Sequence, residues 1–484
     1  MKKIILFSCF IIIQQAVLSQ KKKADPNPAE TMKSAASASM DKDYPRYKEM
    51  ALTIWDYAEV GYKEVKSSAL HQETLTKAGF LVESGVAGIP TAFVATYGSG
   101  KPVIGILAEY DALPGISQKA VPERAIAGKD AGHACGHHLF GTASVAAAIS
   151  IKNLIESKQF SGTIKVYGTP AEEGGSGKVY MVRAGLFNDV DAVIHWHPGS
   201  ENAVTMTSAL ANKSAKFRFR GISAHAAAAP ERGRSALDGV ESMNYMVNMM
   251  REHIPQETRI HYVITNGGKA PNVIPDYAEV YYYVRHPKRD VVKSIFDRVM
   301  KAAEGAAIGT ETKMEFEIIG GTHDLLLNRT LAEVMQTNLE RIGGFSYTDE
   351  EKTFGKKIQA SFDTKGPDVE TASLIQPLKI QMDAGGGSTD VGDVSYTVPT
   401  VGLRTATWVP GTAAHSWQAI AAGGTEIGTK GMMIAAKTMA HTAIDLFTNA
   451  DLIIKATDEF KKVKGSYQYE ALLGNRPPAL NYRD

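Results

Sequence analysis

Cysteine is almost missing from this chain, which has two cysteines, Cys9 and Cys135, among 484 residues. Cys9 lies in a short apolar N-terminal run that follows two lysines and ends in small residues before Gln20. This layout is typical of a secretory signal peptide, so residues 1–19 are expected to be removed and the mature protein exported to the periplasm or beyond. The alternative is a retained N-terminal anchor. After cleavage only Cys135 remains, which excludes an internal disulfide.

Long apolar runs and an excess of charge are also missing. No other stretch approaches the roughly eighteen apolar residues that a membrane helix needs, so no membrane span is expected in the mature chain. The 53 Lys and Arg residues balance 52 Asp and Glu residues, and the net charge of +1 gives no reason to expect a nucleic-acid partner. Glycine, by contrast, is abundant at 44 residues, as an α/β enzyme with sites built from tight turns requires.

The order of strand and helix patterns predicts the domain organisation. Residues 20–41 are rich in Lys, Ala, Ser and Pro and predict a flexible leader. In residues 42–211, β-rich runs alternate with helical patterns, which favours an α/β layer fold. The first two runs, 91–97 and 103–108, are split by Gly-Ser-Gly and predict a hairpin. Further elements are expected as a helix at 141–155 and strands at 163–167 and 192–195.

A different order begins at residue 212. Up to residue 325 the patterns read strand-helix-strand-strand-helix-strand, which is the ferredoxin-like arrangement. Because this segment begins and ends inside the α/β region, residues 212–325 are predicted to be an inserted lid domain. Residues 326–484 then form the second part of the α/β domain.

The densest group of potential metal ligands precedes the helix expected at 141–155. It consists of His133, Cys135, His137 and His138. Imidazole and thiolate groups are the side chains that bind zinc and similar ions, so a metal site is predicted here. The alternative is a fortuitous histidine-rich loop in which Cys135 packs as a small hydrophobe.

An acidic pair, Glu172-Glu173, follows the strand expected at 163–167 and precedes a glycine-rich turn. Adjacent carboxylates can divide the work of hydrolysis, because one can ligate a metal while the other acts as general base on the bound water. A solvated surface pair is the alternative. The glycine-rich turn lacks the Lys-Ser/Thr that a phosphate-binding loop requires.

Three further motifs follow apolar runs. They are His195-Trp-His197, Gly387-Ser-Thr-Asp390-Val-Gly-Asp393 and Gly411-Thr-Ala-Ala-His415. A lone histidine is more often a satisfied polar residue than a ligand. Together, however, these motifs lie at the strand ends of one α/β domain, and open α/β sheets bind ligands beyond the carboxyl ends of their strands.

In this order the motifs resemble a family, the dinuclear metallopeptidases that include aminoacylase, carboxypeptidase G and the indole-acetyl-amino-acid hydrolases. The resemblance covers about residues 45–450 and rests on Asp111-Ala-Leu-Pro, His133-Ala-Cys-Gly-His137, Pro170-Ala-Glu-Glu-Gly-Gly, Ser223-Ala-His225-Ala-Ala and the late His415. It implies a zinc-peptidase-like domain, with a mixed sheet between helices, and an inserted ferredoxin-like dimerisation lid. It further implies two divalent metal ions per subunit, zinc or manganese, a homodimer and a small amide substrate.

The resemblance also implies roles for individual residues. The metal ligands would be Cys135, His137, Glu173, His197 and His415, with His195 as the fallback for His197. Glu172 would be the general base, Asp111 would orient a ligand histidine, and His225 would stabilise the oxyanion, often across a dimer. Asn272 and Arg285 would contact the substrate.

The sequence departs from the family pattern at three positions: His138 stands in place of Asp, Glu109 in place of Asp or His, and Thr389 in place of Glu. The last two match the branch that acts on aminobenzoyl-glutamate, whereas the role of His138 is open. The implied function is hydrolysis of an N-acyl amino acid such as aminobenzoyl-glutamate. The alternatives are a broader N-acyl-amino-acid hydrolase or dipeptidase, and a non-catalytic exported peptide-binding protein. A serine hydrolase is disfavoured because no Gly-x-Ser-x-Gly elbow follows a strand.

Overall fold

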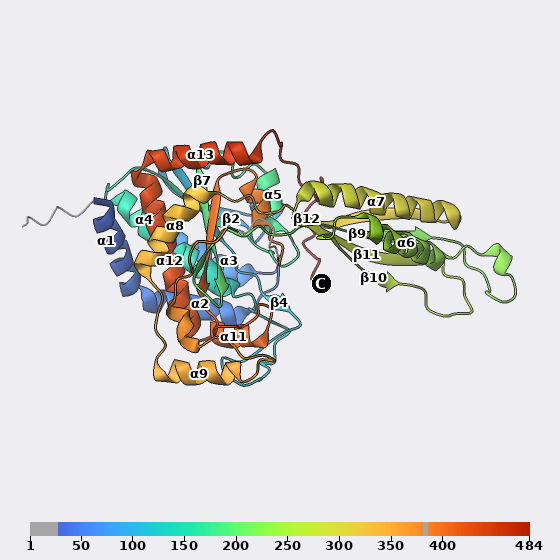
Figure 1. Ribbon diagram of the computed structural model, residues 1–484, viewed down its shortest axis with the longest axis horizontal. Helices are drawn as coiled ribbons and strands as arrows, with labels where there is room; N and C mark the ends of the chain where they lie inside the picture. Colours follow the sequence, from blue (N-terminus) through green and yellow to red (C-terminus); the bar gives the residue numbers. More distant parts are fainter. Residues whose placement is uncertain (1–27, 381–385) are drawn as a thin grey trace, which may run out of the picture.

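The computed structural model describes residues 28–380 and 386–484, so the expected signal peptide lies outside the described residues. Figure 1 shows a larger α/β domain and a smaller domain that projects from it. Helix α1 (Pro28–Lys42) begins the described chain and packs on helix α12 (Glu426–Thr448). The expectation of a flexible leader is therefore wrong for residues 28–41. The composition of this segment hid an apolar stripe at four-residue spacing, Met32, Ala36 and Met40, which is buried.

The larger domain is built on a seven-stranded mixed sheet with strand order β1-β2-β6-β3-β7-β13-β8, as expected for the fold class. Strands β6, β3, β7 and β13 are parallel, and β1, β2 and β8 are antiparallel to their neighbours. Their bounds are β1 Leu81–Ser84, β2 Phe93–Ser99, β3 Val103–Ala108, β6 Gly162–Gly168, β7 Ala192–Gly199, β8 Ala203–Thr205 and β13 Thr400–Ala406. All residues of β3 are buried, as in a strand covered on both faces.

The hairpin expected between β2 and β3 is wrong, because β6 lies between these two strands and pairs with both. The glycines that suggested a tight turn have a different use. A Cβ atom on Gly98, which has a φ of +86°, would lie 2.2 Å from the carbonyl oxygen of Gly162 at the start of β6. Gly98 thus allows the two strands to approach.

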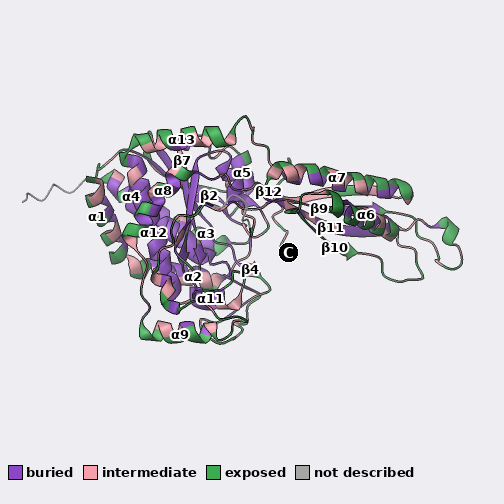
Figure 2. Ribbon diagram, in the orientation of Figure 1, coloured by how far each residue is buried: buried purple, intermediate pink, exposed green. Residues whose placement is uncertain are grey.

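Helix α4 (His137–Glu156) runs through the centre of the larger domain and packs on β3, β6, β7 and α12. It is long and apolar enough to cross a membrane, but 89% of its apolar window is buried inside the protein, as in a core helix. Figure 2 shows that exposed residues concentrate on peripheral helices such as α9 and α13. The other helices are α2 Tyr44–Tyr57, α3 Val65–Lys77, α5 Gly177–Arg183, α8 Arg329–Ile342, α9 Asp349–Gln359, α10 Val391–Ser395, α11 Trp417–Gly423 and α13 Ala450–Lys464.

The smaller, inserted domain has the predicted ferredoxin-like order. Its elements are β9 Ala211–Arg220, α6 Ala236–Met250, β10 Arg259–Asn266, β11 Tyr277–His286, α7 Arg289–Gly309 and β12 Lys313–Thr322. The antiparallel sheet has the strand order β10-β11-β9-β12, and both helices pack on β9 and β11. The domain encloses its own core, in which Phe217, Phe219 and Tyr282 are fully buried.

The strand register fixes which end of the inserted domain faces the larger domain. Asn212 pairs with Arg285 and Thr322 at the end where the chain enters and leaves. Arg220 pairs with Tyr277 at the opposite end, and the ten residues of β9 span about 30 Å. The connections 221–235 and 267–276 therefore lie at the far tip, as Figure 1 shows.

Candidate metal centre

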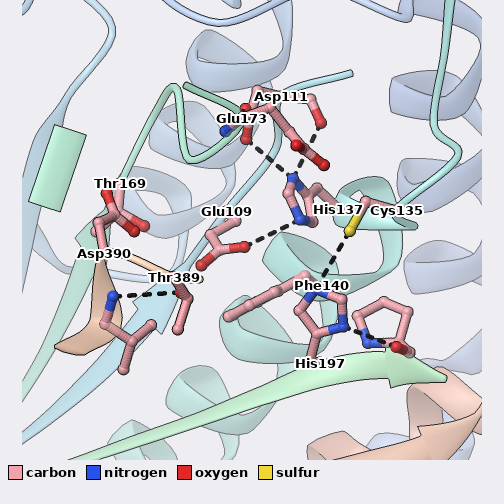
Figure 3. Close-up of polar contacts among 12 residues, drawn as sticks. Glu109, Asp111, Cys135, His137, Phe140, Thr169, Glu173, His197, Thr389 and Asp390 are labelled. Carbon is pink, nitrogen blue, oxygen red and sulfur yellow. Dashed lines mark hydrogen bonds and ion pairs between the residues drawn. The ribbon is translucent and has the colours of Figure 1, made fainter. Parts of the chain in front are cut away.

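The parallel strands of the larger domain deliver polar side chains to one edge of the sheet. Glu109 and Asp111 follow β3, Glu172 and Glu173 follow β6, and His197 is near the end of β7. Cys135 and His137 come from the start of α4, and His415 from the loop after β13. The carboxyl ends of parallel strands share one edge, which explains why motifs far apart in the sequence converge (Figure 3).

The converging side chains form three overlapping groups, in each of which the ligand atoms lie within 4.8 Å of one another. The groups are Cys135 with His137 and His197, Cys135 with Glu173 and His415, and Glu109 with His137 and Glu172. The structure thus brings together all five residues that the resemblance implied as ligands. The shared Cys135 and His137 place the groups side by side, as two neighbouring metal ions require.

Several donor atoms in the cluster fit a divalent cation. The Nε2 atom of His137, the Oε2 atom of Glu109 and the Oε1 atom of Glu173 are buried and have no hydrogen-bond partner among the described residues. Buried polar atoms are normally satisfied, so their common orientation into one small space indicates a missing partner. Imidazole, thiolate and carboxylate donors together suit zinc or manganese.

Asp111 organises the cluster from outside. Its Oδ1 atom accepts a hydrogen bond from Nδ1 of His137 at 2.9 Å, and its Oδ2 atom accepts one from the backbone N–H of Glu173 at 2.9 Å. Burial opposes its charge, but the His137 ring and these hydrogen bonds hold the pKa of Asp111 below its usual range. The His137 ring consequently turns Nε2 toward the cluster, the orientation expected for a metal-binding histidine.

The carboxylates of the cluster are crowded. Burial, followed by the charges of Glu109 and Glu173, raises the pKa of Glu172 well above its usual value. Burial likewise raises the pKa of the Cys135 thiol, whose Sγ atom lies 3.3 Å from Nε2 of His197. A bound cation would favour the deprotonated form of each group, as metal binding generally does.

A buried lysine beside the cluster is a feature that the sequence reasoning missed. The ammonium group of Lys178 lies 2.7 Å from Oε1 of Glu109 and 2.7 Å from Oδ1 of Asp390, and all three side chains are buried. Glu109 in turn places its other oxygen 3.1 Å from Nε2 of His137. The only signal in the sequence was a lysine directly after the glycine-rich turn, at the start of an apolar helix.

The structure separates the histidines that the sequence left as alternatives. His197 lies in the cluster, whereas His195 is buried one pleat earlier against Gly402 and belongs to none of the three ligand groups. His138 points away: its Nε2 atom lies 3.0 Å from the carbonyl oxygen of Gly423. It is therefore a packed core residue in this structure rather than an additional ligand.

The residues implied by resemblance in the inserted domain are not close to the cluster of their own chain. His225 is exposed in the tip connection, where Asn272 joins it through a hydrogen bond from the Ala226 N–H to the Asn272 carbonyl. Both lie about 30 Å from the end of the sheet that faces the larger domain. Arg285, in contrast, is at that end, opposite Asn212 in the sheet.

Comparisons with known proteins agree with this architecture. The model of the "Peptidase dimerisation domain" family matches residues 211–311. The chain is 41% identical to one of the two subunits of the p-aminobenzoyl-glutamate hydrolase of Escherichia coli (strain K12), over 89% of this chain and 95% of that protein. It is 30% identical to the Xaa-Arg dipeptidase of Mus musculus, over 89% of this chain and 93% of that protein.

Solved structures share the fold. An aminobenzoyl-glutamate utilization protein from Klebsiella pneumoniae superposes with a TM-score of 0.61 at 18% identity, covering 84% of this chain and 97% of that chain. A dinuclear metal-binding peptidase of the M20 family from Bacillus subtilis gives a TM-score of 0.58 at 17% identity, covering 84% of this chain and 99% of that chain. These likenesses support the two-domain arrangement.

Proposed function

The chain belongs to the M20 peptidase family, and we propose that it is a metal-dependent amidohydrolase that cleaves an N-acyl amino acid such as p-aminobenzoyl-glutamate. The observation that carries the proposal is the convergence of Cys135, His137, Glu173, His197 and His415 around the buried carboxylate pair of Glu109 and Glu172. The 41% identical relative from Escherichia coli supports the acyl group. A peptide-binding protein would not need the additional carboxylate of Glu172, so catalysis is favoured.

Two divalent ions, zinc or manganese, would be held by the two ligand groups that share Cys135. When bound, such ions polarise a carbonyl group and lower the pKa of a coordinated water. Glu173 would serve the group that includes His415, whose Nε2 atom lies 3.0 Å from a Glu173 oxygen. The hydrogen bond to Glu173 raises the pKa of His415 in the metal-free protein, so both residues would release protons as the metal enters.

Glu172 is the residue that we propose as general base. Its carboxylate lies among His137 and Glu109 without belonging to the Cys135 groups, so it remains available for proton transfer. It would take a proton from the attacking water and pass it to the nitrogen of the leaving amine as the amide bond breaks. The raised pKa of Glu172, caused first by burial, suits a group that must both accept and return a proton near neutral pH.

The inserted domain supports a homodimer. His225 and Asn272 lie at its far tip, so they would act on the site of a second copy of the chain, while Arg285 remains near its own site. The edge strand β10 exposes apolar side chains suited to such an association: Tyr262, Val263 and Ile264 are 37%, 55% and 40% exposed. We further propose that the mature protein is exported, on the strength of the N-terminal segment.

The test is hydrolysis by the purified mature protein, first stripped of metal with a chelator and then reloaded with zinc or manganese. Metal-dependent release of glutamate from p-aminobenzoyl-glutamate would support the proposal. Because the chain is also similar to an Xaa-Arg dipeptidase, dipeptides ending in arginine belong in the same panel. Cleavage of those alone would keep the mechanism and change the substrate. Bound metal without turnover of any substrate would contradict the enzymatic function.

A further inference from the structure

The turn that carries Glu172 and Glu173 has an unfavourable backbone. Ala171 and Ser176 have φ values of +57° and +60°, which side chains other than glycine rarely adopt. Such conformations persist when the surroundings hold them in place. Three contacts from the N-terminal part of the larger domain do so: Glu64 accepts from the Ala171 N–H at 2.8 Å, Asp111 accepts from the Glu173 N–H, and the Tyr62 hydroxyl donates to the Gly175 carbonyl at 2.7 Å.

A fourth contact comes from the opposite end of the sequence. The Tyr482 hydroxyl donates to the carbonyl oxygen of Glu173 at 3.0 Å, and the Arg483 guanidinium donates to the same oxygen. Tyr482 packs edge-on against the Tyr62 ring, with centroids 5.5 Å apart. Gly61 leaves room for this contact, because a Cβ atom there would lie 2.2 Å from the Tyr482 hydroxyl oxygen. Glu173 is thereby held at both its backbone N–H and its carbonyl.

The segment that delivers Tyr482 and Arg483, residues 466–484, crosses between the two domains, and Figure 1 places the end of the chain there. The Arg476 guanidinium donates to the Ile319 carbonyl of β12 at 2.8 Å, and the Arg183 side chain of α5 donates to the Arg476 carbonyl at 2.8 Å. Closer to α13, the Tyr469 hydroxyl donates to Oδ1 of Asp393 at 2.8 Å. These anchors fix the path of the segment on both domains.

We propose that residues 466–484 are a positioning strap for the metal centre, in which Tyr482 and Arg483 hold the Glu173 carbonyl and so orient the carboxylates of Glu172 and Glu173. The inference rests on the proposed function of that site. Tyr482 and Arg483 are positioning residues, because they contact the turn and not the ligand atoms. Loss of both donors would leave the rest of the fold intact and allow the turn to relax from its strained backbone.

The test compares full-length variants: Tyr482→Phe, the double variant Tyr482→Phe/Arg483→Gln, Arg483→Lys, and the control Gln468→Ala, which changes an exposed strap residue. The measurements are the Kd of zinc and of manganese for the metal-free protein by calorimetry, and kcat and KM for p-aminobenzoyl-glutamate. Circular dichroism reports whether each variant is folded.

We expect the double variant to bind metal about tenfold more weakly, since a hydrogen bond from a charged donor is lost with that of Tyr482. Its kcat should fall while KM stays within roughly twofold, as for interactions that act in the transition state. Arg483→Lys should recover part of the affinity, and Gln468→Ala should match wild type. A folded double variant with wild-type metal affinity and kcat would overturn the proposal.

Two further outcomes are assigned in advance. If the wild-type protein cleaves none of the substrates, the proposed function fails, but the metal Kd values still decide the role of the strap. If the double variant does not fold, Tyr482→Phe replaces it, because this change removes one oxygen atom and keeps the ring. Wild-type metal affinity in folded Tyr482→Phe and Arg483→Lys proteins would then overturn the proposal.

Discussion

Substitution of Asp111 by Asn is the perturbation whose outcome the structure specifies most closely. The two carboxylate oxygens accept hydrogen bonds from His137 Nδ1 and from the Glu173 N–H, each at 2.9 Å, and the side chain is fully buried. An amide has one oxygen, so in Asn the NH₂ group must face one of these two donors. One buried donor pair is then left unsatisfied, which costs about 1–3 kcal/mol.

The metal centre should lose more than the fold does. Changing the partner that orients a metal-binding histidine typically weakens metal affinity about 10- to 100-fold. We expect this weakening in calorimetric titrations of zinc or manganese into metal-free Asp111→Asn protein, and a lower urea midpoint without metal. Asp189→Asn is the matched control, because that carboxylate is 60% exposed and pairs with Lys165 at the surface. An Asp111→Asn protein with unchanged metal affinity would refute the reasoning that Asp111 orients His137.

Three further outcomes are expected. Glu172→Gln should retain bound metal, measured by elemental analysis, and lose about 10²- to 10⁴-fold in kcat, and high residual activity would contradict its role as base. Lys178→Met leaves Glu109 and Asp390 without their buried counter-charge and should lower the free energy of unfolding by about 3–5 kcal/mol in urea titrations; an unchanged urea midpoint would argue against the buried pairing. Burial lowers the pKa of His441 to about 3, below its unfolded value, so its contribution to stability is present above pH 6.5 and is lost as the pH falls toward 3. Wild type should therefore lose about 2 kcal/mol more than His441→Gln between pH 7.5 and pH 5, and equal losses would contradict this assignment.

The sequence was a good guide to elements and motifs and a poor guide to neighbours. Strand periodicity located β2 and β3, but periodicity carries no information on pairing, so the insertion of β6 between them could not be foreseen. The ferredoxin-like order was recoverable because its topology follows from the order of its elements. The leader was misjudged because composition was weighed without the apolar stripe of α1.

The site was predictable where chemistry-bearing residues are rare and clustered, as at Cys135 and His137. It was not predictable where ordinary residues act through their position. Lys178 becomes notable only once the fold buries it between two carboxylates. Tyr482 and Arg483 belong to no motif, and their contact with Glu173 joins segments more than 300 residues apart, with sequence separations of 309 and 310.

Helix α4 carries the Cys135–His137 ligand pair at its start, and every residue from His137 to Lys152 is buried. The helix has no free side over this length, so neither ligand can shift unless the packing of the central sheet shifts with it. Variation that suits a new substrate must therefore accumulate elsewhere, in the loops beyond the strands and in the inserted domain. A lineage built on this scaffold can change what it cleaves far more easily than how it holds its metal.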